Sequence, residues 1–294
     1  MKQRVITGVI LAVVLLGMMF GIFTPVLTVI LMFLSVISVK EICDCINLKN
    51  RAMKIFALIS ALVIPFAVTN RFDNLLNIPD LTVYGGAALI IYVILQLIFM
   101  VMRYDDTPFT SAVVVIFTSI AVPESYSVIA RLRDVYTNPD FVEFSATKSV
   151  GVFLILFSFG ASWVSDIFAL FCGMAFGKHK LCPKISPKKT VEGAVGGVIC
   201  AAIINSLLWL VFYKTVWTSC DTIICKLYFV IPASIILSVI SIFGDLSASV
   251  IKRNFGVKDF GKLLPGHGGM MDRFDSTLFV WPMLYCIVKI LALI

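Results

Sequence analysis

The sequence predicts an all-α protein that crosses a membrane several times. Of its 294 residues, 60% are hydrophobic and only 14% are charged, and the mean hydropathy is +1.02. A soluble domain carries roughly 25% charged residues. Several apolar runs also exceed the ~18 residues that mark a transmembrane helix. We therefore expect the bilayer to replace a conventional core.

Nine apolar runs are long enough to be candidate spans. The first follows Met1-Lys-Gln-Arg and could be mistaken for a secretory signal peptide, but no small-residue cleavage site follows it and its apolar stretch is too long. We interpret it as a retained helix. The predicted spans are 5–23, 25–39, 54–69, 82–102, 110–130, 149–177, 192–213, 227–250 and 276–293.

The span 110–130 is the least regular, because Pro123-Glu124 interrupts its apolar run. Charge decides whether it crosses, since lysines and arginines favour cytoplasmic loops. With nine spans, seventeen of these residues fall on one side and six on the other, and without this span the bias disappears. The sequence thus predicts about nine transmembrane helices with a cytoplasmic N-terminus.

This topology places two long polar loops, 178–191 and 251–275, in the cytosol, where much of the net charge of +7 is concentrated. Three roles are open for the basic loops. They could simply satisfy the topology rule, attract anionic lipid headgroups or bind a soluble anionic substrate, and composition does not decide among these roles. We expect residues 1–148 to form an N-terminal membrane region of about five spans. Residues 149–294 would form the catalytic region.

The eight cysteines show no metal-binding pattern. They form no CxxC pair and have no histidine at zinc-ligand spacing. We interpret them as small buried hydrophobic residues. Cys220 and Cys225 share one loop and could pair if that loop faces an oxidising compartment.

Asp166 lies deep in the sixth predicted span, within SFGASWVSDIFALFCGMAFG. A carboxylate near the middle of a membrane costs at least ~2.5 kcal/mol, so it usually faces a cavity, an ion or a partner. The alternative is a structural pair with a buried lysine, or a protonated acid. Gly160, Ser162 and Ser165 allow neighbouring helices to pack closely here.

A second polar group lies in GDLSASVIKR, residues 244–253. On a helix, Asp245, Ser249 and Lys252 share one face, and Arg253 follows Ser249 by four residues. A charged helix end is commonly an interfacial anchor. Anchoring gives no reason, however, for an acid two turns inside the apolar segment.

The segment PGHGGMMDRFD, residues 265–275, is glycine-rich and acidic. Its glycines can bring backbone N–H groups close to a ligand. If a helix begins near Met271, Asp272 and Asp275 lie on one face and Arg273 points elsewhere.

Two lysines precede a span in SPKKTVEG, residues 186–193. Thr190 or Ser186 could cap the following helix, whose N-terminus favours an anion. Carboxylates with oxygen neighbours suit Mg²⁺, and lysines and arginines suit a polyphosphate. Together these segments indicate metal-assisted phosphoryl or nucleotidyl transfer at a membrane surface.

The run SASVIKRNFGVKDFGKLLPGHGGMMDRFDS, residues 247–276, resembles the signature of the phosphatidate cytidylyltransferase (CDP-diacylglycerol synthase) family. The preceding GDL and the run FGKHKLCPKISPKKTVEGAVGG, residues 176–197, are similar to the same family. The resemblance is dense from Asp166 to the end. The first 150 residues resemble the family only as a set of apolar spans.

The resemblance implies a multi-span enzyme that converts CTP and phosphatidic acid to CDP-diacylglycerol and pyrophosphate. It implies Mg²⁺, with K⁺ as a second ion, a homodimer in the lipid bilayer, and no nucleic-acid partner. The implied metal ligands are Asp245, Asp272 and Asp166. The implied catalytic residues are Asp245, Asp272, Asp275, Ser249, Lys252 and Arg253. The implied substrate-binding residues are Ser186, Lys188, Lys189, Thr190, Lys258, Asp259, His267, Gly268, Gly269 and Arg273.

A phosphate monoester has a second pKa near ~6 and needs little help from a base, so we expect His267 to fix the turn rather than to accept a proton. The lack of a long hydrophilic N-terminal extension favours a bacterial plasma-membrane enzyme with a cytosolic active site. Two alternatives remain. One is a CTP-dependent kinase of a polyprenol or diacylglycerol, and the other is a transporter, which would need polar residues through both leaflets.

Overall fold

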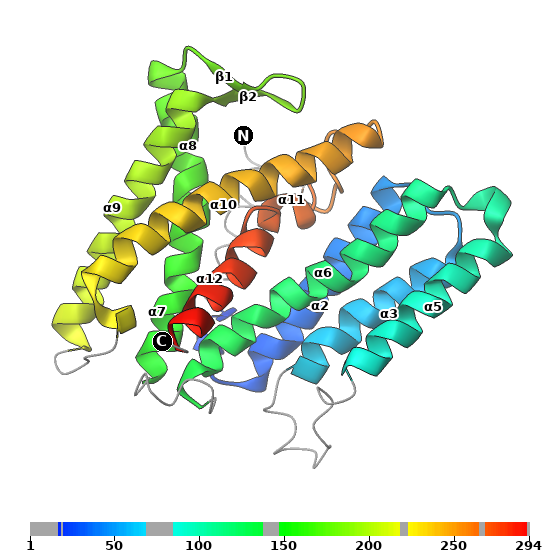
Figure 1. Cartoon of the computed structure of the whole chain (residues 1–294), viewed down its shortest axis with the longest axis horizontal. Helices are drawn as coiled ribbons and strands as arrows, with labels where there is room; N and C mark the ends of the chain where they lie inside the picture. Colours follow the sequence, from blue (N-terminus) through cyan, green and yellow to red (C-terminus); the bar gives the residue numbers. More distant parts are fainter. Residues whose placement is uncertain are drawn as a thin grey trace. The chain divides into compact units, whose positions relative to one another are not determined.

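The computed structural model describes residues 17–18, 20–68, 85–137, 147–217, 223–264 and 268–292. The predicted all-α class is confirmed, since helices dominate and the described residues contain one short two-stranded sheet. Figure 1 shows the elements, with bounds as follows. They are α2 (Pro25–Cys45), α3 (Arg51–Val68), α5 (Gly85–Met102), η2 (Tyr104–Asp106), α6 (Phe109–Arg133), η3 (Asp134–Tyr136), α7 (Lys148–Phe159), η5 (Gly160–Val164), α8 (Ser165–Phe176), β1 (Lys180–Cys182), β2 (Ser186–Thr190), α9 (Val191–Thr215), η6 (Ile223–Cys225), α10 (Leu227–Asn254), α11 (Met271–Phe274) and α12 (Thr277–Leu291).

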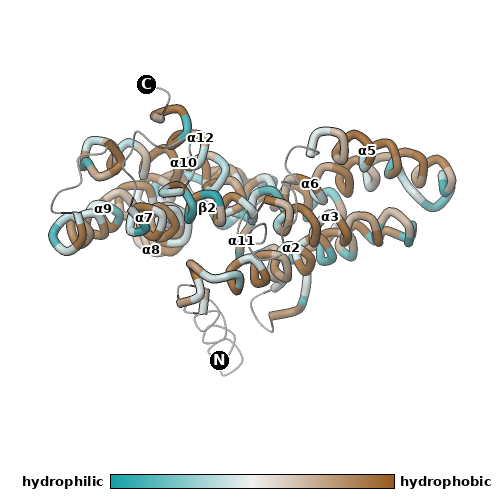
Figure 2. Tube along the Cα trace, turned by 90° about the horizontal axis from the view of Figure 1, so that it is seen from below, coloured by the Kyte–Doolittle hydropathy of each residue, from teal (hydrophilic) through white to brown (hydrophobic). Residues whose placement is uncertain are grey.

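Seven helical segments in the described residues are long and apolar enough to cross a membrane. They are Pro25–Cys45, Arg51–Val68, Gly85–Met102, Phe109–Tyr136, Lys148–Phe176, Val191–Thr215 and Leu227–Asn254. Helix α12 is apolar but has only 15 residues, which is short for the roughly 30 Å hydrocarbon layer. Figure 2 shows the apolar character of these helices in brown. The predicted span 5–23 lies largely outside the described residues, so the count of nine and the orientation of the N-terminus stay predictions.

The chain folds into two compact units, each built from two separate stretches of the sequence. Unit 1 contains Met1–Ala130 and Asn254–Phe274, and unit 2 contains Arg131–Arg253 and Asp275–Ile294. The C-terminal polar region is therefore divided between the units at Phe274. The predicted functional division at residue 148 stays a prediction.

In unit 1, the doubtful span 110–130 is one continuous helix, α6, that runs through Pro123. Proline has no N–H, so it leaves the carbonyl four residues earlier without its helical donor. That carbonyl belongs to Ser119, and it accepts a hydrogen bond of 2.9 Å from the Ser60 hydroxyl on α3. A neighbouring helix therefore satisfies the group that the proline leaves open.

In unit 2, α7 continues into α8 through the π-helical turn η5, which ends one residue before Ser165 and two before Asp166. Such turns insert an extra residue into a helix and often occur at functional sites. The carbonyl of Ala161, inside the turn, accepts a hydrogen bond of 3.0 Å from Ser238 on α10. The turn is therefore supported by the helix that carries Asp245.

Helices α8 and α9 pack closely because α9 begins with glycines. A Cβ atom on Gly197 would lie 2.5 Å from the carbonyl oxygen of Ser165, and one on Gly193 would lie 2.6 Å from that of Ala169. Gly193 and Gly197 are four residues apart and so share a helix face, which is the small-residue spacing that lets membrane helices approach.

The predicted loop 178–191 contains a β-hairpin that the sequence analysis did not anticipate. Strands β1 and β2 are antiparallel, with Lys180 opposite Thr190 and Cys182 opposite Ser186. Figure 1 shows the hairpin at the end of the α8–α9 pair. At its base, the Glu192 carboxylate accepts the backbone N–H groups of Lys178 and His179 at 3.1 and 3.2 Å. The hairpin is thus held against the first turn of α9.

Candidate active site

Unit 2 brings together three carboxylates and two lysines from separate parts of the chain: Asp166, Lys189, Asp245, Lys252 and Asp275. We call them the acid–lysine cluster. They come from α8, β2, α10 and the turn before α12. Gly244 makes one of these approaches possible, because a Cβ atom there would lie 3.0 Å from the Asp275 carbonyl oxygen and 3.1 Å from Ser276 Cα. The glycine before Asp245 therefore lets α10 contact this turn.

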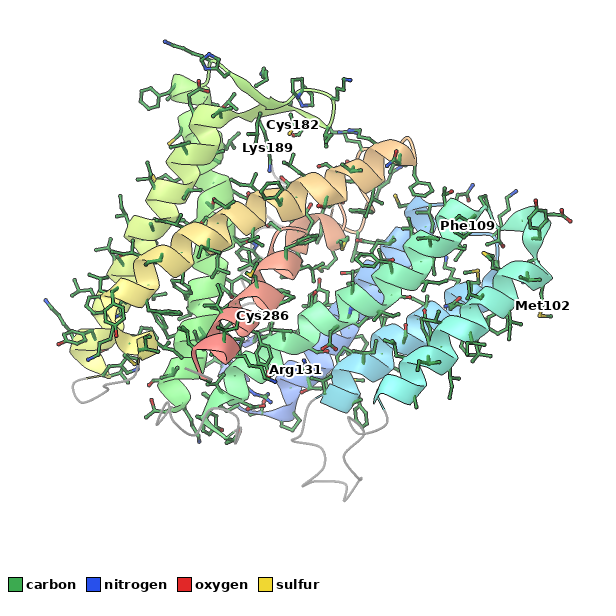
Figure 3. All side chains as sticks on the ribbon, in the orientation of Figure 1. Met102, Phe109, Arg131, Cys182, Lys189 and Cys286 are labelled. Carbon is green, nitrogen blue, oxygen red and sulfur yellow. The ribbon has the colours of Figure 1, made fainter. Side chains whose placement is uncertain are left out.

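Asp245 is paired with a lysine of the hairpin. The Nζ atom of Lys189 lies 2.5 Å from Oδ2 of Asp245, and the Ser249 hydroxyl lies 3.5 Å from Oδ1. Figure 3 shows the Lys189 side chain extending from β2 toward α10. Lys188 is exposed whereas Lys189 is partly buried, as expected for neighbours on opposite faces of a strand. Both lysines were predicted to bind substrate, and the structure brings only Lys189 to this carboxylate.

Asp275 is the most buried acid of the cluster, with 7% of the residue exposed. Its Oδ1 accepts the Ser276 N–H at 2.8 Å, and its Oδ2 lies 3.7 Å from Nζ of Lys252, which is also buried. Burial and the negative charges of Asp245 and Asp166 raise the pKa of Asp275 to about 7, against the opposing effect of Lys252. This carboxyl group therefore gains a proton readily unless more positive charge is nearby.

Asp166 is joined to the same turn by a serine that the sequence analysis missed. The Ser276 hydroxyl donates a hydrogen bond of 3.1 Å to Oδ2 of Asp166 and lies 3.0 Å from the Ser162 hydroxyl. Ser276 thus contacts Asp166 through its side chain and Asp275 through its backbone. Its position directly after Asp275 was the only sequence signal for this role.

In unit 1, α11 begins at Met271, as predicted, and carries Asp272. Oδ2 of Asp272 accepts backbone N–H groups from Phe260 at 2.8 Å and from Gly269 at 2.9 Å. Gly268 has a φ of +83°, and a Cβ atom there would lie 3.0 Å from that oxygen. One amide of the glycine-rich turn therefore binds the protein's own carboxylate.

The remaining predicted residues lie in varied surroundings. Thr190 caps α9 and accepts the Gly193 N–H at 3.2 Å, so this capping prediction is confirmed, while Ser186 lies in β2. Nε of Arg253 donates to the Ile185 carbonyl at 3.5 Å. Lys258 and Asp259 are exposed, Arg273 is half-buried, and His267 lies outside the described residues, as does Cys220. Asp272 and Asp245 belong to different units, and their convergence stays a prediction.

The cluster does not form a preassembled metal cage. In the described part of the chain, no group of three or more His, Cys, Asp or Glu side chains is arranged to hold a metal ion. Mg²⁺ does not need such a cage, since it usually keeps several waters and binds one or two carboxylates together with substrate phosphates. Asp245, beside the Ser249 hydroxyl, supplies the oxygen donors that Mg²⁺ prefers. The residues therefore fit a magnesium ion shared with a phosphate ligand.

The fold and the cluster define a polytopic membrane protein in which acids and lysines meet within and beside its apolar helices. Residues 2–291 match the cytidylyltransferase family, and the chain belongs to this family. It is 44% identical over 151 residues to a phosphatidate cytidylyltransferase of Staphylococcus haemolyticus, and 43% identical over 151 residues to one of Staphylococcus aureus strain COL. Each alignment covers 51% of this chain and 54% of the relative. The chain thus spans about half the length of the curated relatives it matches.

Binding of a divalent cation should release protons from the cluster near neutral pH. An Asp275 carboxyl group with a pKa of about 7 is roughly half protonated at pH 7, and a nearby cation favours its ionised form. We expect Mg²⁺ binding to release up to about half a proton at pH 7 and almost none at pH 9, where the group is already ionised. Titration calorimetry in two buffers of different ionisation enthalpy measures this number. Equal release by the wild type and Asp275→Asn would show that Asp275 is not the group that loses the proton.

Proposed function

We propose that the protein is a phosphatidate cytidylyltransferase, which transfers CMP from CTP to phosphatidic acid and produces CDP-diacylglycerol and pyrophosphate. The family match and the names of the relatives support this reaction. The observation that carries the proposal is the acid–lysine cluster, in which carboxylates and ammonium groups meet beside helices of membrane-spanning length. A reaction between a lipid phosphate and a nucleotide triphosphate needs both kinds of group at a membrane.

The reaction joins two anionic substrates. A phosphate oxygen of phosphatidic acid forms a bond to the α-phosphorus of CTP, and the bond from that phosphorus to the oxygen bridging to the β-phosphate breaks. The electron pair leaves with pyrophosphate. The main obstacles are repulsion between the reactants and the charge on the leaving group, and both are reduced by fixed positive groups. No proton needs to be removed from the lipid phosphate at neutral pH.

The two buried or partly buried lysines are the cations best placed for this task. Lys189 extends from the hairpin and Lys252 from α10, and each already faces a carboxylate, Asp245 or Asp275. The ammonium groups would bind phosphate oxygens when the nucleotide enters. The hairpin also leaves Lys188 and Lys184 exposed, where they would attract the triphosphate before it binds.

We assign Asp245 as the principal ligand of a magnesium ion, with Asp272, Asp275 and Asp166 as further candidates. A bound magnesium ion would neutralise phosphate charge and hold the nucleotide for attack. Asp275 and Ser276 would keep the turn before α12 against α10, through the close approach at Gly244. A potassium ion and a homodimer, both implied by the family resemblance, belong to this proposal as well.

The active site would face the cytosol of a bacterial cell, from the plasma membrane. Within unit 2, the hairpin contacts the C-terminal half of α10 through Lys189 and Asp245 and through Arg253 and Ile185. The two basic loops therefore begin at the same end of this unit, as the distribution of lysines and arginines predicts. CTP is soluble and cytosolic, so this end is where it would be bound.

Labelled CTP distinguishes the proposed reaction from its alternatives. The purified protein is incubated with phosphatidic acid or diacylglycerol in lipid–detergent micelles, with and without Mg²⁺. We expect label from the α-phosphate of CTP to enter lipid only with phosphatidic acid and Mg²⁺. Transfer of label from the γ-phosphate would instead indicate a lipid kinase. Labelling of lipid from neither position, by folded protein, would contradict the proposal and favour a transporter.

Lys189 and Lys188 form a matched pair, because they are adjacent lysines on opposite faces of β2. We expect Lys189→Gln to lower kcat/KM for CTP by about 100-fold, roughly the 2.7 kcal/mol expected for loss of a charge-assisted contact in a poorly hydrated site. Lys188→Gln should change it less than about fivefold, since its side chain is exposed and acts only at long range. Initial rates at saturating phosphatidic acid measure both. Equal losses in the two variants would exclude the proposed role of Lys189.

A further inference from the structure

Glu41 is a buried acid in a part of the chain where the sequence analysis found no functional motif. It lies on α2, within a segment of membrane-spanning length, and only 7% of the residue is exposed. Its carboxylate accepts backbone N–H groups from Met270 at 3.0 Å and from Met271 at 2.8 Å. A buried carboxylate is costly unless its oxygens are hydrogen-bonded, so these two donors explain how Glu41 is tolerated.

Two glycines make room for this carboxylate. A Cβ atom on Gly261 or on Gly269 would clash with the Glu41 carboxylate. Both glycines lie in the polar segment that precedes α11, and both belong to unit 1, as Glu41 does. The close fit therefore fixes the segment against α2 at two points as well as by the hydrogen bonds.

Glu41 and Asp272 bind adjacent amides of the same segment. Asp272 accepts the N–H of Gly269, and Glu41 accepts the next two, of Met270 and Met271. Three consecutive backbone N–H groups are thus bound by two carboxylates. Asp272 follows Met271 directly in the chain. The hydrogen bonds from Met270 and Met271 to Glu41 therefore also hold the backbone of Asp272 in place.

A second set of contacts links the other end of α11 to α2 through Tyr126 of α6. Phe274 is buried and packs edge-on against Tyr126, with ring centroids 5.7 Å apart. The Tyr126 hydroxyl lies 3.0 Å from that of Ser38, which precedes Glu41 by three residues on α2. The same face of α2 therefore supports α11 directly before Asp272, through Glu41, and indirectly after it, through Tyr126.

We propose that Glu41 is a positioning residue for Asp272, acting through the backbone of residues 269–271. This inference rests on the proposed function, in which Asp272 takes part in binding the magnesium–nucleotide complex. Groups that orient a metal ligand from outside the coordination shell typically change metal affinity or activity by 10–100-fold when they are replaced. If Glu41 served stability alone, its replacement would lower the melting temperature without changing the requirement for Mg²⁺.

The test compares Glu41→Gln with Asp44→Asn. Glutamine keeps the size of the side chain, but its NH₂ group cannot accept the amide that one glutamate oxygen binds. Asp44 lies three residues further along α2, is exposed, and pairs with Lys54. We expect Glu41→Gln to raise the Mg²⁺ concentration for half-maximal activity about tenfold or more, with the KM for phosphatidic acid unchanged. Asp44→Asn should match the wild type in both values.

Hydrogen–deuterium exchange measures the positioning without any need for activity. In the purified full chain, peptides that contain residues 269–271 should exchange at least about tenfold faster in Glu41→Gln than in the wild type, because an amide has lost its acceptor. Peptides from α8 and α9 should be unchanged. If Glu41→Gln does not fold, Gly261→Ala, which displaces the carboxylate but keeps its charge, should give the same two effects.

Unchanged exchange at residues 269–271, or an unchanged Mg²⁺ requirement in a folded variant, would overturn the inference. Failure of the proposed function would look different. The wild type would then lack cytidylyltransferase activity, while the faster exchange in Glu41→Gln would still establish that Glu41 holds this segment.

Discussion

The arrangement in unit 2 depends on one electrostatic constraint, which is that neighbouring carboxylates in a poorly hydrated place repel each other. Burial raises the pKa of Asp275, and the nearby charges of Asp245 and Asp166 raise it further, even with Lys252 beside it. Two lysines and two serines offset part of this repulsion. The cluster therefore has affinity for additional positive charge, which is the property that a site for a magnesium–nucleotide complex needs.

Close backbone approaches bring these side chains together. Gly244 lets α10 contact the turn at Asp275, and Gly193 and Gly197 let α9 contact α8, which carries Asp166. Thr190 then caps α9 and fixes the end of the strand that carries Lys189. Small residues at the helix contacts and a capped helix start thus determine where the charges lie, because the bilayer gives no hydrophobic drive for helices to associate.

Much of the fold and part of the acid–lysine cluster could be predicted from the sequence, because the sequence signals for these features are local. Apolar runs gave the helices, a helical repeat placed Asp245, Ser249 and Lys252 on one face, and the Thr190 cap preceded a glycine-rich apolar run. The span 110–130 was found through charge balance in spite of Pro123, and the structure shows that Ser60 supplies the donor that a proline-containing helix needs.

Other features could not be predicted, because they depend on contacts between distant segments. The hairpin has strands of three and five residues rich in lysine, which carry little β signal, and without it Lys188 and Lys189 look equivalent. Ser276 and Glu41 act through partners that are far away in sequence. For Glu41, the only local sign was a glutamate near the end of an apolar span, which is equally typical of an interfacial residue.

The central claim is that the carboxylates of the acid–lysine cluster bind a divalent cation together with the nucleotide. Electron paramagnetic resonance of Mn²⁺ with CTP tests it most directly, because free and protein-bound Mn²⁺ give different signals. Wild-type protein mixed with Mn²⁺ and CTP should reduce the signal of Mn²⁺ in solution, and Asp245→Asn, folded and at equal concentration, should not. Equal depletion by both proteins would contradict it.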